Sequence, residues 1–200
     1  MKKLLALLTS LSCAVAFAQA PAADKPVRVR GTVQSYDGSV LVVKERSGEV
    51  LNLALADNVG VSEVVPIAIT AIQPGSYIGT AAMPSDDGTL KALEVLVFPE
   101  AARGTGEGFS AWDLLPGSTM TNATVADVVT MTQGRTMKVR YKDGEKTIVV
   151  PEGVPIVTVK PGDKGLLVTG AKVIVTAQMK DGKPTALRII AGRDGFAPPM

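Results

Sequence analysis

The residues best suited to bind a ligand lie in one glycine-rich stretch near the middle of the chain. It holds the charged residues Arg103, Glu107 and Asp113 and the aromatic residues Phe109 and Trp112, of which Trp112 is the only tryptophan. The glycines between them allow a backbone to approach a bound molecule closely, and loops of this kind often carry function. We expect these five side chains to form a ligand-binding surface. The alternative is that the two aromatic side chains only pack a connection between two domains, because large aromatics contribute strongly to packing wherever they fall.

The residue types leave little room for nucleophilic or metal-dependent chemistry. The chain has no histidine, and its one cysteine, Cys13, lies in the N-terminal segment. Catalysis by a Ser-His or Cys-His pair therefore lacks its base, and no S-x-x-K pattern occurs. Zinc, copper and iron sites usually take histidine or cysteine ligands. We expect no catalytic residue, no metal site and no cofactor.

The acidic and glycine-rich clusters have simpler explanations than catalysis. Asp86-Asp87, or Glu100 with Glu107, could offer oxygen ligands to calcium, but neither has the spacing of an EF-hand. Asp86-Asp87-Gly88 reads as a hairpin turn. The glycines at 104–108 lack the Rossmann spacing and the Lys-Ser/Thr of a P-loop. A carboxylate pair could hydrolyse glycosides, but a chain with 19 acidic residues always contains some pair.

The N-terminus has the pattern of a secretory signal. Two lysines precede an apolar run from Leu4 to Phe17, and small residues follow it. We expect residues 1–18 to be a signal peptide cleaved after Ala18, or alternatively after Ala20, and the protein to act in the periplasm. The apolar run is short for a membrane span, and no later segment is long and apolar enough. The mature chain is therefore expected to have no membrane span.

Removal of the signal changes the charge balance. The whole chain has 21 basic and 19 acidic residues, and residues 1–18 hold two lysines and no acidic residue, so the mature chain has a net charge of zero. A neutral chain is poorly suited to non-specific binding of nucleic acid or of an anionic membrane. We expect no nucleic-acid partner, and an envelope protein or a small ligand instead.

Two segments of the chain, 27–100 and 121–194, align as diverged copies of one unit. The matching pieces are Gly31-Thr32-Val33 with Ala123-Thr124-Val125, Ser47-Gly48-Glu49 with Asp143-Gly144-Glu145, Pro74-Gly75 with Thr169-Gly170, and Asp87-Gly88-Thr89-Leu90-Lys91-Ala92-Leu93 with Asp181-Gly182-Lys183-Pro184-Thr185-Ala186-Leu187. The offset between the copies stays between 92 and 96 residues. Four matches in one order predict an internal duplication.

Each copy predicts the same series of strands. Alternating apolar and polar residues, rich in valine and threonine, favour strands, and Asp-Gly pairs favour tight hairpins. The expected strands are 27–33, 40–44, 50–56, 77–83 and 92–98 in the first copy, and 123–131, 135–141, 145–150, 171–179 and 185–191 in the second. Five strands with an irregular connection between the third and the fourth are typical of an OB-like barrel. The expected fold is all-β, with two tandem five-stranded OB-like barrels or, as the alternative, two small β-sandwiches.

The sequence therefore divides into six predicted parts. They are a signal peptide (1–18), a flexible N-terminus (19–26), a first β-barrel repeat (27–100), a Gly-rich connecting segment (101–120), a second β-barrel repeat (121–194) and a C-terminal tail (195–200).

One stretch of the first copy resembles a known family. Ile72-Gln73-Pro74-Gly75-Ser76-Tyr77-Ile78-Gly79, followed by Asp87-Gly88-Thr89-Leu90-Lys91-Ala92-Leu93-Glu94-Val95, is similar to an exported bacterial OB-like β-barrel domain family of unknown function, here in tandem duplicate. The whole chain also resembles proteins labelled metal ABC transporter permease.

These patterns together favour a non-enzymatic periplasmic binding or adaptor protein of unknown ligand. The alternatives are an envelope structural or assembly protein and a transport-associated accessory protein. A hydrolase that uses carboxylate chemistry is a further hypothesis.

Overall fold

The computed structural model describes residues 25–131 and 134–200. The predicted signal peptide and nearly all of the predicted flexible N-terminus lie outside the described residues. Within the described part of the chain, no helix has both the length and the apolar character needed to cross a membrane.

The described residues form thirteen strands and three short 3-10 helices. The strands are β1 (Val27–Tyr36), β2 (Val40–Glu45), β3 (Val50–Pro66), β4 (Tyr77–Pro84), β5 (Leu90–Ala92), β6 (Val95–Val97), β7 (Gly108–Ala111), β8 (Thr119–Met131), β9 (Gly134–Tyr141), β10 (Gly144–Val150), β11 (Ile156–Pro161), β12 (Lys172–Lys180) and β13 (Lys183–Gly192). The helices are η1 (Ile69–Ala71), η2 (Glu100–Ala102) and η3 (Lys164–Leu166). The expectation of an all-β chain is confirmed.

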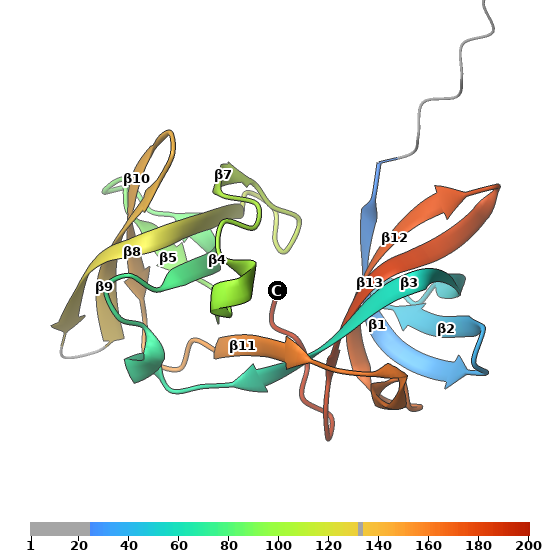
Figure 1. Cartoon of the computed structure of the whole chain (residues 1–200). Coiled ribbons are helices and arrows are strands. Elements are labelled where there is room, and N and C mark those ends of the chain that lie inside the picture. The colour runs from blue at the N-terminus through green and yellow to red at the C-terminus, as the bar shows by residue number, and fades with distance from the viewer. Residues whose placement is uncertain (1–24, 132–133) are drawn as a thin grey trace, which may run out of the picture.

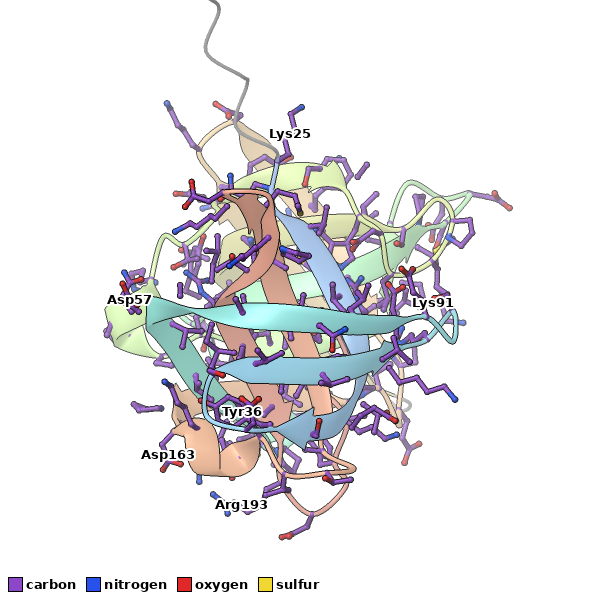
Figure 2. All side chains as sticks on the ribbon, turned by 90° about the vertical axis from the view of Figure 1, so that its right-hand side faces the viewer. Lys25, Tyr36, Asp57, Lys91, Asp163 and Arg193 are labelled. Carbon is purple, nitrogen blue, oxygen red and sulfur yellow. The ribbon has the colours of Figure 1, made fainter. Side chains whose placement is uncertain are left out.

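Five of the strands close into a barrel. Following the pairings around the ring gives the order β1, β2, β3, β13, β12 and back to β1. All of these pairs are antiparallel except β3 with β13, which are parallel. We call this barrel the first ring; it is the group of strands on the right of Figure 1. Figure 2 views it face on, with Lys25 at one end and Asp163 and Arg193 at the other.

A second closed set of pairings lies on the left of Figure 1. It runs β4, β5, β10, β9, β8 and back to β4, with β5 and β10 parallel. We call it the second ring. Each ring takes three strands from one predicted repeat and two from the other, so two tandem barrels with boundaries at 27–100 and 121–194 are not confirmed. The chain instead interleaves its two halves.

The long strand β3 causes this interleaving. Its 17 residues leave the first ring without turning back, and the sequence around Asp57 and Asn58, expected to be irregular, remains extended. Its second half pairs in parallel with β13 and antiparallel with β11, where Val64 lies opposite Val159. The strand β11 runs in the opposite direction to β3. The strands that follow β3, β4 and β5, therefore join the strands on the left of Figure 1, and those that follow β11, β12 and β13, join the first ring.

Three apolar clusters fill the rings and the space between them. The first ring encloses valine, leucine and isoleucine side chains from all five of its strands, among them Val33, Leu41 and Ile189. The second ring encloses a similar set from its own strands, among them Ile78 and Ile148. A third cluster packs between the rings, where five buried side chains meet: Val64, Leu96, Val157, Ile174 and Met200. Met200 belongs to the predicted C-terminal tail, which therefore contributes to this packing.

A salt bridge stabilises the place where β3 and β11 cross between the two rings. Glu63 on β3 is only 6% exposed, and its two carboxylate oxygens accept hydrogen bonds from Arg193 at 3.1 and 3.0 Å. The Lys160 ammonium on β11 lies 3.4 Å away. The hydrogen bond from Arg193 lowers the pKa of Glu63, because it favours the charged carboxylate.

The close packing of β1 against β2 leads to a first prediction. A methyl group at Gly31 would overlap the carbonyl oxygen of Lys44 and come within 2.6 Å of Val43 Cγ1. Overpacking of this kind costs about 1–3 kcal/mol, so Gly31→Ala is expected to lower the free energy of unfolding, measured in urea, by that amount. Gly60→Ala is the matched control, since nothing lies within 4 Å of its Cβ position. Equal stability of the two variants would contradict the tight β1–β2 contact.

Candidate functional site

The predicted connecting segment, 101–120, is ordered by its contacts with the second ring. Its residues form the end of η2 and the whole of β7, and β7 pairs with β8 so that Phe109 lies opposite Thr121. After β7 a loop returns to β8, held by a hydrogen bond from the Trp112 amide to the Ser118 carbonyl at 2.8 Å. The segment thus forms one wall of the space between the rings.

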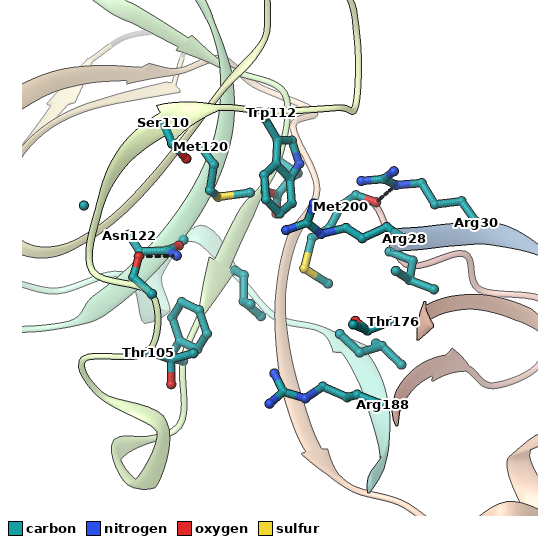
Figure 3. Close-up of a pocket in the computed structure, with 18 residues that line it drawn as sticks. Arg28, Arg30, Thr105, Ser110, Trp112, Met120, Asn122, Thr176, Arg188 and Met200 are labelled. Carbon is teal, nitrogen blue, oxygen red and sulfur yellow. Dashed lines mark hydrogen bonds between the residues drawn. The ribbon is translucent and has the colours of Figure 1, made fainter. Parts of the chain in front are cut away.

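That space contains a cavity of about 380 Å³. Residues of β1, β12 and β13 line it from the first ring, and residues of β4, β6, β7 and β8 line it from the other side. Figure 3 shows Arg28, Thr176 and Arg188 entering from one side, and Trp112, Met120 and Asn122 from the other. The volume lies at the lower end of the range for small-molecule sites.

One wall of the cavity is basic and comes from the first ring. Arg30 is buried, and it donates from Nε to the backbone oxygen of the last residue, Met200, at 2.8 Å and from Nη2 to Asp113 Oδ1 at 2.7 Å. Arg28 lies 3.6 Å from the other oxygen of Asp113, and its guanidinium sits 3.8 Å from the centre of the Trp112 ring. Arg188 on β13 completes this wall.

Trp112 and Asp113 are the two predicted binding residues that the structure brings to this cavity. Trp112 lines it directly, and its indole Nε1 is buried without a hydrogen-bond partner among the described residues. Asp113 is not part of the lining but pairs with Arg28 and Arg30 of the basic wall, and the hydrogen bond from Arg30 lowers the pKa of its carboxyl group. Both also hold the segment against β1, so the packing role that the sequence left open applies to them as well.

The other three predicted binding residues lie away from the cavity lining. Arg103 pairs with Glu100 at 2.6 Å and donates to the Gly75 carbonyl at 3.0 Å. Glu107 accepts a hydrogen bond from the Lys142 amide at 2.9 Å. Phe109 is 40% exposed, with the Lys146 ammonium 4.3 Å from the centre of its ring. These contacts tie the segment to neighbouring turns and strands.

Glu94 is the functional candidate that the sequence analysis missed. It lines the cavity, and its side chain is fully buried. Its Oε1 accepts a hydrogen bond from the Ala81 amide at 2.8 Å, while Oε2 has no hydrogen-bond partner among the described residues. Burial raises the pKa of this carboxyl to about 8, so it is mostly protonated at neutral pH.

A signal for Glu94 was present in the sequence. It stands between Ala92 and Leu96 on the inward face of a predicted strand, where a charged residue is costly. The repeat alignment ends at Leu93 and Leu187, and one step further it places Glu94 opposite Arg188. The structure brings both of these residues to the same cavity.

Over the described ranges, no group of three or more His, Cys, Asp or Glu side chains is arranged to hold a metal ion. Glu94 is the one acidic side chain among the described residues that line the cavity.

No known family model, curated protein or solved structure matches the chain. The resemblance to an exported OB-like family therefore remains a prediction, and the transporter label gains no support.

Proposed function

We propose that the chain is a non-enzymatic, exported binding protein that holds a small ligand in the cavity between its two rings. One observation carries the proposal: two residues that line the cavity, Glu94 and Trp112, each have a buried hydrogen-bonding atom without a partner among the described residues. Buried polar atoms are almost always paired in folded proteins, because an unpaired one costs about 1–3 kcal/mol. A bound molecule with a polar group would pair with at least one of these atoms.

Binding accounts for the cavity better than hydrolysis does. Hydrolysis of a glycoside normally uses two carboxyl groups on opposite sides of the bond, whereas Glu94 stands alone in the described lining. The carboxylate of Asp113 is engaged by Arg30 and Arg28. The predicted signal peptide supports a periplasmic location for this binding.

We further propose that both rings are OB-like barrels derived from one duplicated unit. Matching bulges support this, one between Val33 and Ser35 in β1 and one between Val125 and Asp127 in β8. At each bulge the valine exchanges two backbone hydrogen bonds with the turn before β12 or β4: Val33 with Gly170 and Ala171, and Val125 with Gly75 and Ser76. These are equivalent positions in the predicted alignment.

Native mass spectrometry of residues 19–200, purified from periplasm without denaturant, tests the binding proposal. A retained small molecule is expected as an added mass on the wild-type protein. Thr176 lines the cavity (Figure 3), so Thr176→Phe is expected to fill the cavity and abolish the added mass. Thr176→Val, which keeps the side-chain volume, is expected to retain it.

Thermal unfolding of the same three proteins serves as the control for folding. If Thr176→Phe keeps the added mass while unfolding at the wild-type temperature, the ligand binds elsewhere and the proposal fails. It fails also if the wild-type protein carries no added mass and no compound of a small-molecule library stabilises it selectively over Thr176→Phe.

A further inference from the structure

The charges around the cavity are unbalanced. Three guanidinium groups, those of Arg28, Arg30 and Arg188, line it, while the one acidic side chain of the lining, Glu94, is mostly neutral. Asp113 supplies one negative charge to two of the arginines, and the terminal carboxylate of Met200, which accepts from Arg30, supplies a second, so one positive charge remains. The wall that faces the ligand is therefore cationic.

The three arginines are not equally available. Arg30 is buried and engaged by Asp113 and the terminal carboxylate of Met200. Arg28 is held more loosely, at 3.6 Å from Asp113, against the face of Trp112. No hydrogen bond, ion pair or ring contact engages the Arg188 guanidinium among the residues that the structure describes. Arg188 can therefore form a bidentate pair of hydrogen bonds with an incoming anion.

The rest of the lining is largely apolar. Leu96 and Phe98 contribute on one side, Ile174 and Ile190 on the other, and Met120 adds a flexible side chain. These side chains suit a hydrocarbon body, which gains by leaving water. A multiply charged, strongly hydrated anion such as phosphate would lose hydration here with only one uncommitted arginine to replace it.

We propose that the cavity binds a small monocarboxylate with an apolar body, its carboxylate held by Arg188 with Arg28 beside it. The apolar body lies among Leu96, Ile174 and Ile190. The proposal rests on the proposed function, since it needs the cavity to be a binding site. It adds the class of ligand and the residue that recognises its charge.

Trp112 is a built-in reporter, because it is the only tryptophan and lines the cavity. We suggest titrating residues 19–200 with octanoate, with octanamide, which has the same body without the charge, and with inorganic phosphate, which has charge without the body. Octanoate is expected to change the Trp112 fluorescence and to bind about tenfold or more tightly than either of the others. Its carboxylate gains charge-assisted hydrogen bonds that octanamide lacks, and its apolar body gains burial that phosphate lacks.

Variants separate the roles of charge and cavity. Arg188→Gln is expected to weaken octanoate binding about tenfold or more and to leave octanamide binding unchanged. Lys183→Gln removes a positive charge from the same strand, β13, at a residue outside the cavity lining, and is expected to leave both affinities unchanged.

Failure of this inference can be distinguished from failure of the proposed function. If octanoate and octanamide bind equally and Thr176→Phe abolishes both, the cavity is a binding site without a preference for carboxylates, and only this inference fails. Tightest binding of phosphate also overturns it. If Thr176→Phe leaves every affinity unchanged, the ligands bind outside the cavity and both proposals fail.

Discussion

Exchange of Glu94 for glutamine is expected to remove most of the loss of stability that burial of this carboxyl predicts between about pH 5 and about pH 9. The carboxyl has a pKa of about 8 in the folded protein and an ordinary value of 4.5 when exposed. Between these values the folded protein keeps a proton that the unfolded chain has released, so stability falls as the pH rises. Each pKa unit corresponds to about 1.4 kcal/mol, which puts the total loss on the order of 5 kcal/mol.

Glutamine suits the site because it resembles the protonated acid. Its side-chain oxygen can accept the Ala81 amide hydrogen bond that Glu94 Oε1 accepts, and it carries no charge at any pH. The three arginines that line the cavity do not offset the burial, since desolvation is the first cause of the shift and the Ala81 hydrogen bond is the opposing one. Urea unfolding at a series of pH values measures the effect.

Glu63→Gln is the control, because the pKa of Glu63 is shifted in the opposite direction. Arg193 lowers that pKa, so the stability that Glu63 contributes is present above its unfolded value and is lost as the pH falls. Glu63→Gln should therefore change the acid side of the profile and leave the alkaline side parallel to wild type. A Glu94→Gln profile parallel to wild type on the alkaline side would show that Glu94 is not buried as described.

Local pattern was enough to predict most strands but not their partners. The alternation around Val29 and Val33 identifies β1 because such a pattern fits only a half-buried strand. The choice between pairing β1 with β12 or with β4 depends on distant residues, and the two copies offer similar edges at both places. Asp57 and Asn58 lie in a bulge between Leu55 and Gly60, which both pair with β13, and no local pattern reveals that pairing.

The candidate site was predictable only in part for the same reason. Trp112 and Asp113 were identified because rare or charged residues in a glycine-rich segment stand out. Arg28 and Arg188 occupy ordinary polar positions in alternating strands, and only the interleaving of the halves brings them to one cavity. Glu94 was missed, but local pattern alone could have identified it, since a charged residue on the inward face of a strand is a local signal.

The interleaved arrangement predicts that a cut chain stays in one piece. A protease site inserted between Gly104 and Thr105, at an exposed turn, would yield two fragments, one that ends at this site and one that begins at it. Both rings need strands from both fragments, through the pairs β1–β12, β3–β13, β4–β8 and β5–β10. The cut protein is therefore expected to elute from a size-exclusion column as one particle of the uncut mass at about micromolar concentration, as an obligate complex does.

Tandem barrels would give the opposite result, because each fragment would then close its own barrel and only the connecting contacts would hold the two together. Two separate peaks after cleavage would thus contradict the interleaved rings. Denaturing electrophoresis provides the control that cleavage is complete. Elution in urea, where the strands unpair, provides the control that the fragments can separate at all.

The same cut also bears on the cavity, because Arg28 and Glu94 lie on one fragment and Trp112 and Arg188 on the other. A ligand that bridges the walls is therefore expected to raise the urea concentration at which the fragments part.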